Sequence, residues 1–193
     1  MLDCLVGSEM CIRDRFLQGE ELLRSHRAEI DWKTTLRDQG SFGLNVYLDE
    51  RDFIGSLDKT GAILGVGLSR SIIFPKSGIF LSYKTNFEHF YANSDVQTYI
   101  KRSFDVSTRQ GINNSTFAST SINYSEKDYE ASDPLLGLRT DKGLSLRFGL
   151  TKVLNLCWNA DMGVTFSNNK SSIGLYERSN EGLAVKFNYL CTE

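Results

Sequence analysis

The chain has 193 residues, a formal net charge of −2 and a mean hydropathy of −0.28. A charge this close to neutral excludes general attraction to nucleic acid, so no nucleic-acid partner is expected. No apolar run approaches the roughly 20 residues that a membrane-spanning helix needs, so no helical span is expected in this sequence.

The first segment, residues 4–15, reads CLVGSEMCIRDR and resembles the translation of a transposon-type sequencing adapter over twelve consecutive residues. Segments of such origin are set aside before fold reasoning. We therefore assign residues 1–15 to the adapter, which leaves 20 basic and 21 acidic residues. The native part is expected to begin near Phe16 as a fragment of a longer gene. Cys4 and Cys11 then carry no information about the redox environment.

Residues 16–28 form an irregular lead-in, in which Leu17–Arg27 is the one segment predicted as a short helix. From residue 29 to residue 190 the dominant signal is alternation of apolar and polar side chains, which predicts β-strands. The alternation is strong over residues 60–74, 79–87, 143–152, 156–167 and 183–189, and weaker over 28–37, 43–50, 95–108 and 114–125.

These nine candidate strands are long. Strands of soluble domains usually have about five to six residues, whereas a tilted strand that crosses a bilayer needs about nine to eleven. Short connections at 38–41, 75–78, 109–112 and near Asn155 alternate with long ones at 49–59, 125–141 and 168–180; residues 92–95 are a short exception. Transmembrane barrels have short periplasmic turns and longer extracellular loops. The predicted fold is therefore all-β: an antiparallel up-and-down transmembrane β-barrel, partial, over residues 29–190, with 191–193 as a tail.

In such a barrel the apolar face contacts lipid and the polar face lines the lumen. The predicted lumen-facing charges are Lys84, Arg147, Asp161 and Lys186. Aromatic residues near strand ends are typical of two interfacial girdles: Phe74, Phe87, Phe90, Tyr91, Tyr124, Trp158, Phe166 and Tyr189. Arg102 falls on the apolar face of its strand, where it requires a snorkelling side chain, a bulge that shifts the register, or a protein neighbour.

Two loop motifs lie near the C-terminus. Residues 129–141 read YEASDPLLGLRTD, and residues 168–178 read NNKSSIGLYER. They resemble the C-terminal barrel of the surface lipoprotein assembly modifier family, which has the loops Asp-Pro-Leu-Phe-Gly-x-Arg-x-Asp and Ser-Asn-Ile-x-Leu-Tyr-x-Tyr-x-Arg. The matching positions are Asp133, Pro134, Leu135, Gly137, Arg139, Asp141, Ser171, Ile173, Leu175, Tyr176 and Arg178. Leu136 and Ser172 depart from the motif, the second motif is shortened, and the chain continues past Tyr189.

The resemblance implies a Gram-negative outer-membrane protein that helps to translocate or display surface lipoproteins or related secreted cargo, without covalent chemistry. It also implies outer-membrane lipid, the cargo and the barrel assembly machinery as partners. A helical periplasmic domain and further strands would precede this fragment. Within the motifs, Arg139, Asp141 and Arg178 are candidates for a charged cluster that orders the loops; isolated solvated charges are the alternative.

No catalytic, cofactor-binding or metal-binding residues are predicted. The only histidines, His26 and His89, have no recognisable Ser or Asp partner for acid–base catalysis. Two histidines with Cys157 and Cys191 are too few for a metal site, and whether these two cysteines pair is left open. The protein is therefore expected not to be an enzyme. A general porin-like outer-membrane channel and a secreted β-sandwich binding module are the alternative functions.

Overall fold

The computed structural model describes residues 4–17, 20–36, 40–54, 59–134, 137–155 and 157–189, with side chains from residue 23 onward. Ten strands account for most of them: β1 (Cys4–Leu17), β2 (Glu20–Leu36), β3 (Gly40–Phe53), β4 (Gly61–Phe74), β5 (Ile79–Ala92), β6 (Tyr99–Asn113), β7 (Thr116–Tyr129), β8 (Thr140–Val153), β9 (Trp158–Ser171) and β10 (Arg178–Tyr189). Two short 3₁₀ turns, η2 (Asp95–Gln97) and η3 (Gly174–Tyr176), precede β6 and β10.

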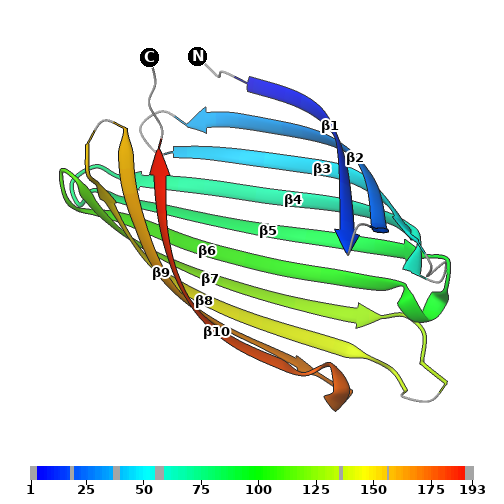
Figure 1. Ribbon diagram of the computed structural model, residues 1–193. Helices are drawn as coiled ribbons and strands as arrows, with labels where there is room; N and C mark the ends of the chain where they lie inside the picture. The colour runs from blue at the N-terminus through cyan, green and yellow to red at the C-terminus, as the bar shows by residue number, and fades with distance from the viewer. Residues whose placement is uncertain are drawn as a thin grey trace.

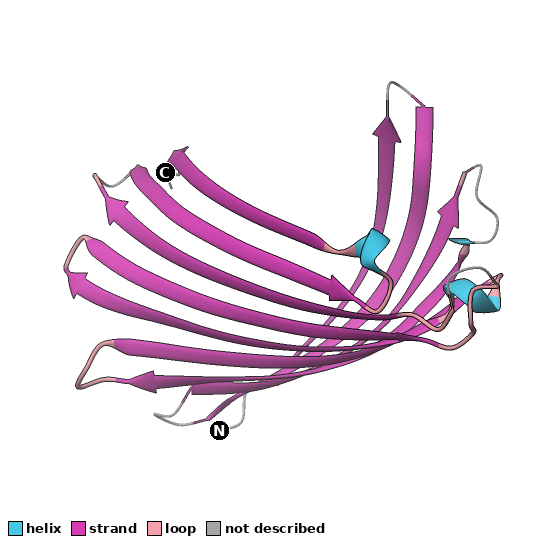
Figure 2. Cartoon of the chain, turned by 90° about the horizontal axis from the view of Figure 1, so that it is seen from below, coloured by secondary structure: helices cyan, strands magenta, loops and turns pink. Residues whose placement is uncertain are grey.

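All ten strands belong to one antiparallel sheet in which each strand pairs with its neighbour in the chain, in the order β1 to β10. The sheet curves into an open trough (Figures 1 and 2). In the described part, β1 and β10 are edges that do not pair with each other. The predicted all-β, up-and-down architecture is confirmed, with nine of its strands, β2–β10, formed by residues from 20 onward. The β-sandwich alternative is wrong, because the described strands form a single sheet.

The helix predicted over Leu17–Arg27 is wrong, because this segment contributes the end of β1 and the first half of β2. Its register with β3 continues the alternation of the rest of the sheet: His26 pairs with Glu50 and Ala28 with Leu48. The adapter-like residues 4–15 lie in β1, which pairs with β2. Backbone pairing at an open sheet edge does not depend on side-chain identity. This pairing therefore does not assign the segment to the native protein.

From β2 to β10 the connections alternate in length, although the strands extend further than the sequence predicted. Two to four residues join strands at one rim, over 37–39, 75–78, 114–115 and 154–157. Six to ten residues join them at the other rim, over 54–60, 93–98, 130–139 and 172–177. The turn predicted at 109–112 lies at 114–115 instead, because β6 continues through a register shift between Gly111 and Asn113. We call the two ends the short-turn rim and the long-loop rim.

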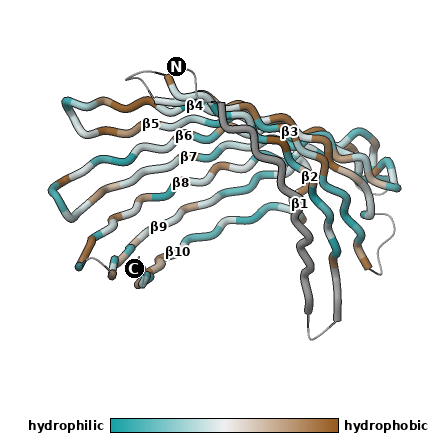
Figure 3. The backbone as a smooth tube through the Cα atoms, turned by 90° about the horizontal axis from the view of Figure 1, so that it is seen from above, coloured by the Kyte–Doolittle hydropathy of each residue, from teal (hydrophilic) through white to brown (hydrophobic). Residues whose placement is uncertain are grey.

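On one face of the sheet, side chains from strands two apart come into contact, and this identifies the concave face. On one face Tyr47 of β3 reaches across Gly65 of β4 and donates a hydrogen bond to Glu88 of β5, with 2.7 Å between oxygens. Side chains two strands apart converge in this way on the concave side of a curved sheet and diverge on the convex side. The face of Tyr47 is therefore the concave face. Figure 3 shows hydrophobic and hydrophilic residues alternating along the strands, as this two-sided arrangement requires.

A small apolar cluster fills the concave face near the long-loop rim. It comprises Tyr47, Ile63, Phe90 and Tyr99, each at most 9% exposed, with Ala92 and Tyr129 packed against it. Phe90 and Tyr99 pair directly across β5 and β6, with ring centroids 5.2 Å apart. Phe90 therefore does not belong to an outward aromatic girdle, because its neighbours His89 and Tyr91 take the opposite face.

Candidate functional site

The four predicted lumen charges all lie on the concave face. Lys84 pairs with Ser69 and Asp105, and Arg147 with Ser121 and Thr165. Asp161 of β9 is directly opposite Lys186 of β10. Because paired residues share a face, these positions follow from the register. The concave face is therefore a polar wall from β2 to β10, interrupted by the apolar cluster.

Near the long-loop rim several charges of this wall form ion pairs. Lys101 Nζ lies 3.1 Å from Glu88 Oε2, and the other oxygen of Glu88 accepts the bond from Tyr47. Similar short contacts join Arg27 to Glu29 at 2.6 Å and Arg51 to Asp49 at 2.9 Å. Arg27 also lies 3.8 Å over the Tyr47 ring. Together these contacts join β2 to β3, β3 to β5 and β5 to β6. The contact between β3 and β5 passes over the backbone of β4.

The first loop motif ends in a compact joint around Arg139. Its Nε and Nη2 donate to the two carboxylate oxygens of Asp141, at 3.0 and 2.6 Å. Its guanidinium also lies 3.5 Å from the centroid of Tyr176 and 4.6 Å from that of Tyr129. Planar stacking and a bidentate carboxylate contact are both interactions that arginine makes and lysine does not. Arg139 thus joins the 130–139 loop to η3 of the second motif.

Ser172 makes a second connection between the two motifs. Its hydroxyl accepts a hydrogen bond from the Thr140 amide at 3.0 Å and donates to the Leu138 carbonyl at 3.1 Å. Its own amide donates to the Thr140 carbonyl at 2.9 Å. A position that departs from the family motif therefore ties the loops together directly. Ser171 accepts from the Ile173 amide at 3.2 Å and shapes the entry into η3.

The remaining motif residues have local or exposed positions. Asp133 and Gly137 exchange backbone hydrogen bonds of 2.9 and 3.0 Å, closing a tight turn in which Gly137 has a φ of +85°. Such a φ favours glycine. Pro134 is exposed within this turn, whereas Leu135 and Leu136 lie outside the described residues. Leu175 is 79% exposed. Arg178 begins β10 opposite Asn169 and forms no ion pair with a described carboxylate, so the predicted cluster contains Arg139 and Asp141 without it.

The convex face carries a continuous apolar band. Cross-strand pairs such as Leu48 with Leu64, and Val66 with Phe87, extend it from β3 to β5. Further pairs, among them Leu150 with Met162, extend it to β10. The band residues are 37–70% exposed and include Leu44, Val46, Leu48, Leu64, Val66, Leu68, Phe87, Phe104, Ile122, Tyr124, Leu144, Phe148, Leu150, Met162, Phe166, Leu183, Val185 and Phe187. An exposed apolar surface of this extent marks contact with lipid or protein.

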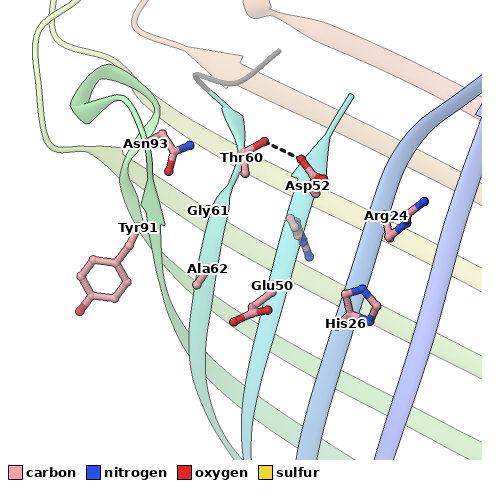
Figure 4. A pocket seen from close by; sticks show the side chains of 10 residues that line it. Arg24, His26, Glu50, Asp52, Thr60, Gly61, Ala62, Tyr91 and Asn93 are labelled. Carbon is pink, nitrogen blue, oxygen red and sulfur yellow. Dashed lines mark hydrogen bonds between the residues drawn. The ribbon is translucent and has the colours of Figure 1, made fainter. Parts of the chain in front are cut away.

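Polar residues border the band on the convex side of the long-loop rim. On β6–β9 they are Arg102, Glu126, Asp128, Lys142 and Lys170, with Lys142 3.0 Å from Glu126 and Arg102 3.7 Å from Asp128. On β2–β4 they surround a pocket whose lining includes Arg24, His26, Glu50 and Asp52 (Figure 4). We call these two groups the polar collar. Arg102 lies in an unshifted register, so the bulge alternative for this residue is wrong.

The two histidines lie on the convex face. His89 stacks on Tyr91 with 3.8 Å between ring centroids. Its Nε2 is 2.7 Å from a Glu130 oxygen but not in hydrogen-bonding alignment. No group of three potential metal ligands occurs among the described residues. Among these residues there is also no helix long and apolar enough to cross a bilayer.

Cys157, next to the short-turn rim, is disulfide-bonded. Cys191, the partner considered from the sequence, lies outside the described residues. Nearby, Trp158 and Tyr189 contact each other on the convex face with ring centroids 5.0 Å apart. Both aromatic rings take the outward position that the sequence predicted for them.

No protein-family model and no curated protein sequence matches the chain. Among solved structures it is similar to the ferric yersiniabactin uptake receptor FyuA from Yersinia pestis, with 12% identity and a TM-score of 0.35. The alignment covers 98% of this chain and 40% of that receptor, so the chain spans about two fifths of its length. A similarity this low supports no conclusion about ligand or activity.

Proposed function

We propose that this chain is part of the wall of an outer-membrane β-barrel in a Gram-negative bacterium, and that the intact protein helps to translocate or display surface lipoproteins or related cargo. The convex apolar band, bordered by the polar collar, carries this proposal. A lipid-facing band needs a polar boundary where the headgroups begin. The chain's own contribution is passive, through a polar concave wall and ordered rim loops.

Strand dimensions support the membrane part of the proposal. A strand of 14 residues such as β3 extends about 46 Å at roughly 3.3 Å per residue. With a tilt near 45° it crosses about 33 Å, which matches a hydrocarbon core about 30 Å thick. The backbone groups within the sheet are paired from β1 to β10, as a bilayer demands. Closure of the barrel requires that both open edges of the described sheet be paired.

The lipoprotein part of the proposal depends on the two loop motifs and their resemblance to the surface lipoprotein assembly modifiers. Here the motif residues act together, because Arg139, Tyr176 and Ser172 join two loops that are separated by a β-hairpin. The ordered loops at the long-loop rim would guide cargo that leaves the barrel. In this account neither loop carries out bond making or breaking.

The experiment uses the complete gene from the source genome, in a Gram-negative host that lacks it. A co-expressed surface lipoprotein is tested for exposure by protease shaving of whole cells. We expect exposure to require the gene, to fall with Arg139→Ala, and to be unchanged with Lys152→Gln, a convex-face substitution far from the loops. Equal exposure with and without the gene would reject the lipoprotein function while leaving the barrel in place.

A porin-like channel is the second candidate, favoured by the polar concave wall. Planar-bilayer recordings of the intact protein separate the two functions. A large, steady conductance without cargo supports the channel, whereas a closed barrel that nonetheless exposes lipoprotein supports translocation.

A further inference from the structure

A groove on the concave face holds two cationic side chains that the described chain leaves without an ion-pair partner. It measures about 370 Å³ and crosses β7–β10 in the half of the wall nearer the short-turn rim. Arg147 and Lys186 line it, and neither lies within 4.0 Å of a described carboxylate. Near the long-loop rim, Lys101 and Arg139 are by contrast ion-paired, and Lys127 lies over the Tyr99 ring.

The floor of the groove is formed by residues too small to obstruct it. Ser119, Gly149, Gly163 and Ala184 pair in one row across the four strands. The Arg147 guanidinium extends over this row, since a Cβ at Gly163 would lie 3.7 Å from its Nε and 3.9 Å from its Nη2. Glycine in a strand commonly allows such close approach. The row therefore leaves the guanidinium facing open space in the groove.

The opposite wall of the groove contains Lys186 and Asp161. The two Asp161 oxygens accept hydrogen bonds from neutral donors, the Thr151 hydroxyl and the Asn188 amide, both at 2.6 Å. These two hydrogen bonds keep the Asp161 carboxylate close to the sheet. It forms no ion pair with Lys186. The two cations sit on either side of the small-residue row, in rows four residues apart along the strands, which is about 13 Å at roughly 3.3 Å per residue. Their long side chains can both extend over the small residues between them.

We propose that this groove binds a small solute that carries phosphate or carboxylate groups, with its oxyanions bridging Arg147 and Lys186. Arginine offers a planar pair of donors to such groups, and lysine supplies a mobile point charge. The site recognises oxyanion chemistry, and either phosphate or carboxylate provides it. This inference does not require insertion of the chain into a membrane.

The full chain, refolded in zwitterionic detergent micelles, is titrated with inorganic pyrophosphate and separately with citrate by calorimetry. We expect saturable binding of at least one probe, weakened about tenfold by Arg147→Gln and by Lys186→Gln, since each removes a charge-assisted contact. Asp161→Asn removes a repulsive charge and should strengthen binding. Ala184→Leu fills the floor without a change in charge and should weaken it. The stronger probe identifies the preferred oxyanion.

The matched control is Lys84→Gln, which removes one cation from the same face of the sheet outside the groove and should leave the affinity unchanged. Circular dichroism and the heat-dependent shift in gel mobility establish that each variant is folded. Absence of saturable binding to both probes would overturn the proposal. Equal weakening by Lys84→Gln and Lys186→Gln would also overturn it, because general attraction to the positive wall would then explain the binding.

Discussion

The guanidinium of Arg139 lies 3.5 Å from the ring centroid of Tyr176, a residue 37 positions further along the chain, while the same group binds Asp141 through two hydrogen bonds. One side chain therefore fixes the end of the 130–139 loop, the start of β8 and the turn that precedes β10. These three segments meet at the long-loop rim, where the two family-like motifs lie.

Replacement of Arg139 by lysine tests this joint. Lysine keeps the charge but loses the planar stacking and the bidentate contact. We expect a loss of about 1–2 kcal/mol in unfolding free energy, because Arg139 is partly exposed and solvent screens the pair. Limited proteolysis should show faster cleavage within 130–139 and 172–177. Arg178→Lys is the control, and equal sensitivity in both variants would contradict the joint.

Ser172→Ala tests the second link between the motifs. The change removes a hydrogen bond to the Thr140 amide and one to the Leu138 carbonyl. Each such bond contributes about 1 kcal/mol, so hydrogen exchange at the Thr140 amide should accelerate about fivefold. Ser115→Ala, in a turn at the opposite rim, should leave that amide unaffected. An unchanged exchange rate in Ser172→Ala would show that the two loops are held by other contacts.

Gly65 is predicted to be intolerant of any side chain. A Cβ at this position would overlap the Tyr47 ring, which lies against the glycine on its way to Glu88. Overpacking of this kind costs about 1–3 kcal/mol, which urea unfolding of Gly65→Ala in detergent should report. Gly182→Ala is a matched change in another strand, where a Cβ meets nothing within 4 Å. Similar stabilities for the two variants would contradict the packing of Tyr47 across β4.

Substitution of lysine on either face of the sheet distinguishes lipid contact from solvent contact through its effect on stability. Val66 is in the middle of the apolar band, and Ser145 is on the concave face of β8. Val66→Lys should lower the stability of the chain in lipid vesicles by about 2–4 kcal/mol, the cost of a cation near the bilayer midplane. Ser145→Lys should have a small effect. Equal costs would contradict the assignment of the convex face to lipid.

The sequence predicts the faces of the central strands well because period-two alternation encodes them directly. Leu64, Val66 and Leu68 form one face, and the lumen charges Lys84, Arg147, Asp161 and Lys186 all share the other. The wrong helix prediction over Leu17–Arg27 has a related cause. This segment has few apolar residues, so the sequence does not distinguish the two-residue period of a strand from the 3.6-residue period of a helix. The turn at 114–115 was misplaced because Gly111, which looks like a turn residue, lies at a register shift within β6.

Contacts between distant segments were not predictable from periodicity. Tyr129 and Tyr176 belong to the two motifs, but only the folded hairpin brings both rings against Arg139. The groove depends on Gly149, Gly163 and Ala184 aligning across three strands, which requires the register. Phe90 is directed inward, against the prediction of an outward aromatic, because it is out of phase with Phe87, His89 and Tyr91 along β5.

The most direct test of a lipid-facing convex surface is a spin-label scan along β8 in lipid vesicles, over residues 144–150, with the native cysteines replaced by serine. The account predicts that Leu144, Leu146, Phe148 and Leu150 positions are accessible to oxygen dissolved in the bilayer, and that Ser145, Arg147 and Gly149 positions are accessible to a water-soluble nickel chelate. Loss of this alternation, or its reversal, would contradict a membrane-embedded wall with a polar concave face.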